Sequence, residues 1–350
     1  MAPEYKIPEY NIPYYEDNTR VSNSSIGWFL NKGPAYFYRM LQGEENGLDL
    51  PQLRRGTMIH EFLLQPEEFE KDYMLFTGNK PKSTQGQKFC EEYINSTEIE
   101  PNKRAVDAYS KSYSIVGKSD EKVLSEALKM SEEYKDYIEA LKENKILISQ
   151  YDYTKLLTVK SNIFNHKLAN KLLKDAGDYG NVHIYHEFQI NWEYIGVPCK
   201  SLLDCVMFDF NNRVCTIMDI KTTSKLWHFE DSMKEFDYAR QLQFYKMAVG
   251  WWLEKHKDEI GSLHRHEENI QYNSGGENDP EYTTWIFKFY IVAIDNGNNS
   301  EVRVFNVYLN TGVRYKILDT MQQIRFHMKS NEWEHSMDYY TGDGSENLNL

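Results

Sequence analysis

The sequence has few cysteines, no glycine-rich nucleotide motif and no long apolar segment. Its cysteines, Cys90, Cys199, Cys205 and Cys215, include no CxxC pair and no zinc-like spacing, so we expect reduced core residues. Neither GxGxxG nor GxxxxGK[ST] occurs, which leaves dinucleotide cofactors and ATP hydrolysis without support. No apolar run approaches the roughly 18 residues that span a bilayer. The start, Met-Ala-Pro-Glu-Tyr-Lys, lacks the features of a secretory leader, so we expect a cytoplasmic protein without a membrane partner.

Positive charge is also scarce. The 350 residues include 40 Lys and Arg against 53 Asp and Glu, a net charge of −13. If the chain binds DNA, a local basic channel and bound cations must therefore provide the attraction. The candidates for such a channel, each of which is more simply an ordinary surface charge, are Arg54, Arg55, Lys160, Lys200 and Lys225.

A predicted β-hairpin carries two aspartates that face each other. Residues 200–210 and 213–221 are rich in β-branched and apolar residues, and Asn211-Asn212 between them tolerates the positive φ of a tight turn. If this pair is the whole loop, Asp204 lies directly opposite Asp219. Opposed residues have Cβ atoms roughly 4.5–5.5 Å apart, close enough for two carboxylates to hold one cation. A slip of one residue would place the two acids on opposite faces.

The same register places Lys221 on the face of Asp219, so that one apolar face ends in two acids and a lysine. Burying two like charges side by side is unfavourable unless a cation or a proton relieves their repulsion. The hairpin therefore predicts a site for a divalent metal. The simpler alternative is that Lys221 only forms an ion pair with one aspartate at a sheet edge.

The order of elements predicts a mixed α/β sheet with a helical N-terminal part. Expected strands lie at 182–194, 197–210, 213–221, 283–295 and 301–309, and expected helices at 22–41 (broken at Gly33-Pro34), 52–64, 228–257 and 311–330. The expected organisation has four parts and a polar loop at 264–281. The parts are an arm at 1–21 that is disordered or docks on a neighbour, a mainly helical part at 22–175, the sheet core at 176–330 and an acidic disordered tail at 331–350.

Two helical patterns add polar residues to this core. Gly56-Thr-Met-Ile-His60 sets a histidine one turn after a glycine on an otherwise apolar helix. Gln241 and Tyr245 stand at i and i+4, on one face of a later helix. Taken alone, His60 is more simply a core or surface residue, and the second pattern an ordinary amphipathic helix.

Together and in this order, the motifs resemble those of the PD-(D/E)XK nuclease superfamily, and more narrowly its RecB-like and RecE/λ-exonuclease-like branches. The matching residues are Gly56, His60, Glu187, Asp204, Asp219, Ile220, Lys221, Thr222, Thr223, Gln241 and Tyr245. The phrases Gly196 to Asp204 and Ile217 to Thr223 look especially like the exonuclease VIII group of phages and prophages. The resemblance covers about 56–65 and 185–250, and the segment 84–175 has no counterpart in it.

The resemblance implies a restriction-endonuclease-like fold and a Mg²⁺-dependent deoxyribonuclease, with Mn²⁺ as a substitute. Asp204, Asp219 and the backbone carbonyl of Ile220 would hold the metal, because Mg²⁺ prefers oxygen ligands. His60 would add a nitrogen ligand or orient a metal-bound water. Lys221 would position or deprotonate the attacking water and offset the phosphate charge.

The resemblance gives the remaining matched residues two alternative roles each. Gln241 and Tyr245, with Thr222 and Thr223, would bind the DNA backbone or steady the site. Glu187 would be an outer metal ligand, or alternatively cap a strand edge.

The activity implied is an exonuclease that degrades one strand of duplex DNA from an end, in phage-type recombination. Two alternatives stay open: an endonuclease with the same site, and a non-cleaving nucleic-acid-binding or assembly protein with the same fold. Partners implied by analogy are duplex DNA ends, further copies of the chain and a single-strand annealing protein.

Overall fold

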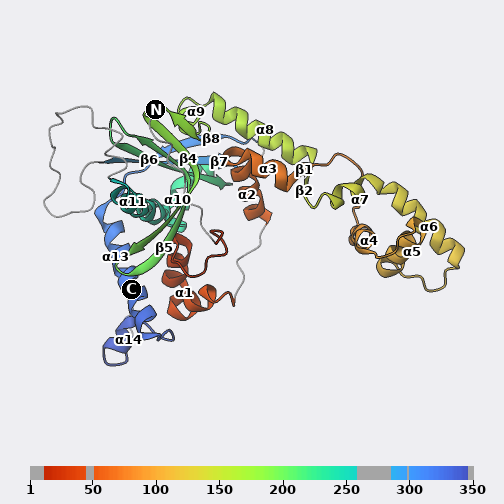
Figure 1. Cartoon of the computed structure of the whole chain (residues 1–350), viewed down its shortest axis with the longest axis horizontal. Coiled ribbons are helices and arrows are strands. Elements are labelled where there is room, and N and C mark those ends of the chain that lie inside the picture. The colour runs from red at the N-terminus through yellow and green to blue at the C-terminus, as the bar shows by residue number, and fades with distance from the viewer. Residues whose placement is uncertain (1–11, 45–50, 258–284, 298, 346–350) are drawn as a thin grey trace. The chain divides into compact units, whose positions relative to one another are not determined.

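The computed structural model describes residues 12–44, 51–257, 285–297 and 299–345 (Figure 1). The expected loop at 264–281, and the outer ends of the expected arm and tail, lie outside these residues. The chain divides into two compact units: unit 1, Met1–His60 with Val159–Leu350, and unit 2, Glu61–Thr158.

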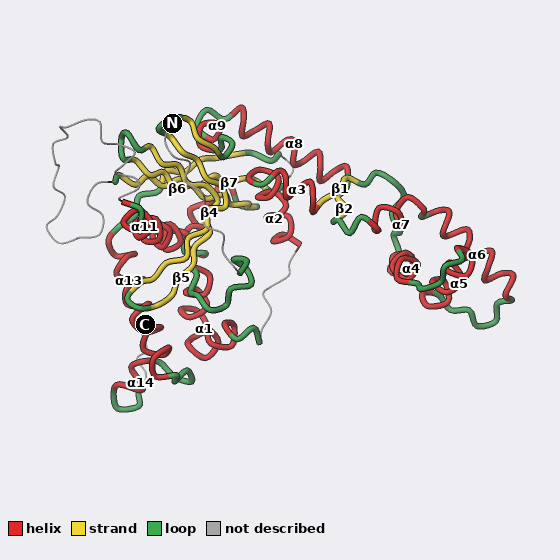
Figure 2. The backbone as a smooth tube through the Cα atoms, viewed as in Figure 1, coloured by secondary structure: helices red, strands yellow, loops and turns green. Residues whose placement is uncertain are grey.

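A six-stranded mixed sheet forms the centre of unit 1 (Figure 2). Its strands, in the order in which they lie side by side, are β3 (Gly177–Tyr179), β4 (Val182–Tyr194), β5 (Val197–Asp209), β6 (Val214–Thr223), β7 (Ile286–Asp295) and β8 (Val302–Asn306). Neighbouring strands are antiparallel except β6 and β7, which are parallel. A parallel pair needs a long crossover connection, and helices lie in the chain between these two strands.

Helices flank this sheet, and several of them, including α11 and α13, form the main core with it. The described helices of unit 1 are α1 (Asn23–Leu41), the first part of α2 (Pro51–Leu64), the last part of α8 (Gln150–Asn165), α9 (Ala169–Leu172), the 3-10 turn η1 (Leu226–His228), α10 (Phe229–Glu235), α11 (Tyr238–Lys255), α13 (Thr311–Ser330) and α14 (Met337–Thr341). Phe208 and Ile217 of the sheet are fully buried in one cluster with Phe244 of α11 and Met321 of α13. The predicted fold class, a mixed sheet flanked by helices with a helical N-terminal part, is confirmed.

Helix α1 shows how local sequence sets an element. It begins with a capping box, in which the Ser22 hydroxyl accepts from Ser25 N and the Ser25 hydroxyl accepts from Ser22 N. The predicted break is confirmed at Gly33, whose φ of 82° only glycine adopts readily, just before Pro34.

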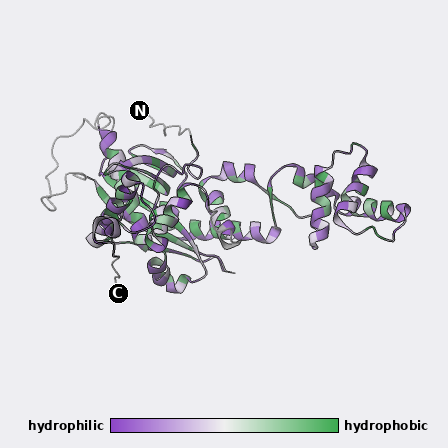
Figure 3. Cartoon of the chain, turned by 90° about the horizontal axis from the view of Figure 1, so that it is seen from below, coloured by the Kyte–Doolittle hydropathy of each residue, from purple (hydrophilic) through white to green (hydrophobic). Residues whose placement is uncertain are grey.

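Unit 2 is helical and has its own core. It contains α3 (Pro66–Asp72), α4 (Thr84–Asn95), α5 (Pro101–Ser112), α6 (Asp120–Glu133), α7 (Lys135–Lys142) and the short parallel strands β1 (Tyr73–Leu75) and β2 (Ile146–Ile148). Phe89, Ala105, Val123 and Ile138 are buried together there. Figure 3 shows hydrophilic and hydrophobic residues alternating along these helices, as expected for helices that cover a small core.

The boundaries differ from the predicted ones. The predicted helical part, 22–175, is divided between the units at His60 and Val159, because 61–158 packs on its own core. Residues 331–345, predicted as a disordered tail, contain α14 and the buried Trp333, whose ring stacks on Tyr38 with centroids 4.9 Å apart.

The described part of the expected arm, residues 12–21, docks on strand β5. Val21 forms a parallel bridge with Cys199. The Lys200 Nζ donates to the carbonyl oxygens of Tyr14 and Asp17 at 2.6 and 2.5 Å. Lys200 is therefore engaged in holding this segment, and is not a surface charge available to DNA.

All four cysteines are free and buried. Among the described residues, no helix is both long enough and apolar enough to cross a membrane.

Candidate metal centre

The ladder between β5 and β6 has the predicted register. Phe208 pairs with Cys215 and Cys205 pairs with Met218. The predicted two-residue loop is wrong, because the turn comprises the four residues from Phe210 to Arg213 and the last pair is Asp209 with Val214. The longer turn takes one residue from each strand, so the pairing beyond it is unchanged.

Both ladders around Asp204 are interrupted at its level. Asp204 and Asp219 are next in register after Cys205 and Met218, but the Asp204 Oδ2 instead accepts a hydrogen bond of 2.6 Å from Ile220 N. On the other side of β5, the ladder with β4 has no pair at Glu187. The φ of Glu187 is 47°, a left-handed value that is uncommon for a residue other than glycine. Three acids thus lie at one level on three adjacent strands, where the sheet opens.

His60 joins two of these acids. The candidate ligand atoms of His60, Glu187 and Asp204 all lie within 4.8 Å of one another, and His60 Nδ1 is 3.6 Å from Asp204 Oδ2. The approach of helix α2 depends on Gly56, because a β-carbon there would lie 3.2 Å from Thr222 Oγ1 on β6. The glycine therefore lets the helix approach the strand closely, and His60 follows one turn later. We call His60, Glu187 and Asp204 the acid–histidine cluster.

Asp219 lies outside this cluster of ligand atoms and is held by other side chains. It is 1% exposed, and its Oδ1 accepts a hydrogen bond of 3.0 Å from Gln241 Nε2. The same amide nitrogen lies 2.9 Å from the Tyr245 hydroxyl oxygen, to which it donates. Lys221 Nζ lies 2.6 Å from the Asp219 Oδ2, but this oxygen receives no hydrogen bond of good geometry.

The charges of this pair influence each other. The pKa of Asp219 is raised to about 7, because burial and the Asp204 carboxylate raise it by more than the ammonium of Lys221 lowers it. Burial lowers the pKa of Lys221, but Asp219 and Asp204 outweigh this effect and leave that pKa raised. Lys221 is therefore held in its charged form beside the acids.

The ion pair of Lys221 with Asp219 matches part of the simpler alternative, in which the lysine only pairs with one aspartate at a sheet edge. Strand β6 lies between β5 and β7, however, so the pair is inside the sheet and not at its edge. Lys221 keeps 19% of its side chain exposed, whereas Asp219 keeps 1%.

Tyr238 is a site neighbour that the sequence patterns did not indicate. Its ring centroid lies 4.9 Å from the Lys221 Nζ, a cation–π contact that helps to orient the lysine. Asp237, with a left-handed φ of 50°, precedes helix α11 and turns the chain there. The next ring, Phe236, stacks on Tyr238 with centroids 5.7 Å apart and is 54% exposed. A contact that depends on such a turn is not predicted by the spacing of residues in the sequence.

The structure places the other predicted residues as follows. Tyr245 is buried and Gln241 donates to Asp219, so both steady the site. Thr222 lies at the Gly56 contact. Thr223 is buried, and its hydroxyl oxygen accepts from Lys225 N at 2.9 Å. The substrate-binding role of the four residues stays a prediction.

Ile220 keeps the position expected of a backbone ligand. Its N–H points to Asp204 on β5, and in an extended strand the carbonyl of the same residue points to the same side. That oxygen is therefore directed toward the open part of the sheet beside the three acids.

The donor set fits a divalent cation. Carboxylates suit hard cations such as Mg²⁺ and Mn²⁺, and imidazole is also accepted by Mn²⁺ and other transition metals. Asp219 Oδ2 is buried and lies 2.6 Å from the Lys221 Nζ without an aligned hydrogen bond, so it retains lone pairs that a metal ion can use.

No family model matches the sequence, and no curated protein is similar to it. The structure is similar to a crystal structure described as that of a "putative exonuclease" from Eubacterium rectale. The TM-score is 0.46 with 11% identical residues, over 95% of this chain and 91% of that chain.

Proposed function

We propose that this protein is a metal-dependent deoxyribonuclease that hydrolyses phosphodiester bonds. The observation that carries the proposal is the acid–histidine cluster at the opening of the sheet, with Asp219 and Lys221 beside it. Buried like charges are unfavourable in the absence of a ligand, and a binding-only protein gains nothing from keeping them.

His60, Glu187 and Asp204 would hold Mg²⁺, with Mn²⁺ as a substitute, and Asp219 and the Ile220 carbonyl would complete the set. When bound, such an ion polarises the scissile phosphate and lowers the pKa of water. Gln241 fixes one carboxylate oxygen of Asp219 and leaves the other directed toward Lys221.

Lys221 is suited to bind a phosphate oxygen and to hold the attacking water. Its raised pKa favours the ammonium form, which donates hydrogen bonds but cannot accept a proton. In this arrangement Lys221 therefore offsets phosphate charge and positions water, and it is less suited to the predicted role of removing a proton from the water. The Tyr238 ring limits the directions in which its ammonium can turn.

The finer part of the proposal rests on the motif order from Gly56 to Tyr245. That order supports an exonuclease that degrades one strand from the ends of duplex DNA, in phage-type recombination. Assembly with further copies of the chain and with a single-strand annealing protein belong to the same proposal. The alternative enzyme activity is that of an endonuclease. The alternative without enzyme activity is a nucleic-acid-binding or assembly protein that does not cleave DNA.

One assay separates these functions. End-labelled linear duplex and closed circular DNA are incubated with Mg²⁺, Mn²⁺ or EDTA, using wild type, Asp204→Asn, Lys221→Ala and the exposed control Glu193→Gln. Digestion of the linear DNA alone supports the exonuclease, and nicking of circles supports the endonuclease. The absence of metal-dependent cleavage of both DNAs would contradict the proposed nuclease activity. So would an Asp204→Asn variant that is as active as wild type.

A further inference from the structure

A concave site away from the acids lies beside the first half of strand β7. The ladder with β8 begins at Tyr290, and after Val307 N donates to the Phe289 carbonyl the chain leaves the sheet to enter α13. The stretch from Ile286 to Phe289 is therefore not covered by β8. A cavity of about 790 Å³ forms there, bounded by β7, α11, the start of α13 and the chain between β8 and α13. We call it the β7 groove.

The lining combines positive charge with aromatic rings. The described residues that line it include Lys246, Lys288 and Arg314 and no acid, although the chain has 53 acidic residues against 40 basic ones. Its rings are Trp285, Phe287, Phe289, Tyr290 and Tyr308, and its amides are Gln243, Asn306 and Asn310.

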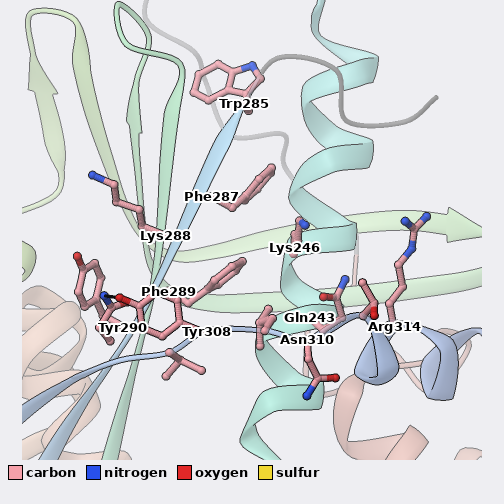
Figure 4. Close-up of a pocket in the computed structure, with 14 residues that line it drawn as sticks. Gln243, Lys246, Trp285, Phe287, Lys288, Phe289, Tyr290, Tyr308, Asn310 and Arg314 are labelled. Atoms are coloured by element: carbon pink, nitrogen blue, oxygen red, sulfur yellow. Dashed lines mark hydrogen bonds between the residues drawn. The ribbon is translucent and has the colours of Figure 1, made fainter. Parts of the chain in front are cut away.

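The three cations and the exposed ring of Tyr308 suit a ligand that is both flat and anionic, whereas Phe289 is buried and Trp285 and Phe287 pack against the core. Figure 4 shows Phe287 and Lys246 on facing elements of the groove, and the Lys246 Nζ lies 5.6 Å from the Phe287 ring centroid. Arg314 stands in the first turn of the 20-residue helix α13, whose N-terminus also favours anions. Tyr308 is 86% exposed, and its hydroxyl oxygen accepts from Asn306 Nδ2 at 3.0 Å.

We propose that the β7 groove binds a single strand of nucleic acid. Bases stack on exposed aromatic rings and phosphates pair with cations, whereas a duplex hides its base faces from such rings. The inference deepens the proposed nuclease function, since single strands are what an exonuclease leaves behind, but its test does not depend on cleavage.

The groove and the acids lie along the same strand and the same helix. Phe287 pairs with Cys215 and Ile291 with Asp219, so the two sites are separated by four residues of β7, roughly 13 Å at the rise of a strand. Helix α11 contributes Gln241 to one site and Gln243 and Lys246 to the other. The two sites are therefore neighbours on the same strand and helix, with the buried Phe289 between them.

Binding of fluorescein-labelled oligothymidylate to the full chain in EDTA tests this inference by anisotropy. Lys246→Gln and Arg314→Gln should each weaken binding several-fold at low salt, and each should reduce the slope of log affinity against log salt by about 0.7. Tyr308→Ala should weaken binding at least fivefold, on the order of one lost base stack. The matched controls, Lys255→Gln on α11 and Tyr315→Ala on α13, lie outside the groove and should bind as wild type does.

Unchanged binding by the three groove variants, or equal losses in the two controls, would overturn the proposal. So would tighter binding of a blunt duplex of the same length, because the groove would then not select exposed bases. The stabilisation of each variant by Mg²⁺ against heat is measured in parallel. It reports on the candidate metal centre alone, so a failure of the groove and a failure of the proposed nuclease site are distinguishable.

Discussion

Gly56 and Thr222 meet where helix α2 reaches strand β6, and a β-carbon on residue 56 would lie 3.2 Å from Thr222 Oγ1. This separation is shorter than an ordinary contact between carbon and oxygen. The absence of a side chain at Gly56 is thus a condition for the position of His60.

Gly56→Ala should move the helix away from the strand. We expect a loss of about 1–3 kcal/mol in the free energy of unfolding, the usual cost of overpacking, together with weaker stabilisation by metal. Thr222→Ala removes the oxygen and should restore part of both, with a coupling of about 0.5–3 kcal/mol in a double-mutant cycle. Urea unfolding of the four proteins measures this, and additive effects would show that the two residues are not coupled.

Gln241→Leu should destabilise the protein by about 1.5–3 kcal/mol, because the buried Asp219 loses a hydrogen bond to a charged acceptor. Tyr245→Phe removes only the hydroxyl that accepts from the same amide and should cost about 0.5–1.5 kcal/mol. Urea unfolding again measures both. A larger loss for Tyr245→Phe than for Gln241→Leu would show that Asp219 does not depend on this glutamine.

Metal should stabilise the protein through the acid–histidine cluster. A ligand present at about 100 times its dissociation constant adds about 2.7 kcal/mol to the stability, so Mg²⁺ or Mn²⁺ should raise the melting temperature over that in EDTA. His60→Ala, Glu187→Gln and Asp204→Asn should each reduce the rise, whereas Glu193→Gln, exposed on the same strand as Glu187, should keep it. An undiminished rise in all three cluster variants would place the metal elsewhere.

Much of this site could be predicted because strand alternation and register depend on few residues. The predicted pairing of β5 with β6 is correct although the predicted turn length is not, because the observed turn takes one more residue from each strand. The left-handed backbone of Glu187 leaves no trace in the side-chain pattern. Its place beside Asp204 is therefore visible only in the structure. Likewise, the i, i+4 spacing of Gln241 and Tyr245 indicated a shared face but not that this face points to Asp219.

The unit boundary was missed for a different reason. Helices α2 and α8 both continue across it, so the helical pattern is not interrupted at His60 or Val159. The acidic composition of the tail predicted disorder. The ring of Trp333 instead packs in an aromatic pocket formed by Phe37, Tyr38 and His327.

His327 should make the protein less stable in acid. It is fully buried, its Nδ1 lies 2.5 Å from the carbonyl oxygen of Glu332, and its Nε2 has no hydrogen-bond partner. Burial lowers the pKa of His327 below the ordinary value of 6.5, although Glu332 partly opposes this effect. The unfolded chain therefore binds a proton first, and stability falls as the pH drops below about 6.5 toward the folded pKa.

Urea midpoints measured from about pH 8 to about pH 5 test this pH dependence. His327→Phe should lose less stability on acidification than wild type, whatever its stability at high pH. His335→Gln, an exposed histidine close by in the chain, serves as the control and should follow wild type. The same acid slope in wild type and His327→Phe would assign the dependence to other groups.

The positions of the site residues along the chain also have a consequence for folding. Glu187, Asp204, Asp219 and Lys221 lie within the two consecutive hairpins β4–β5–β6, and Gln241 follows on the crossover helix α11. Contacts between residues close in sequence form faster than contacts that close long loops. His60 is separated from Glu187 by more than the whole of unit 2. We therefore expect the acids to assemble first and the histidine to arrive last, so that a nascent or refolding chain carries the repelling carboxylates before it carries the complete set of metal ligands.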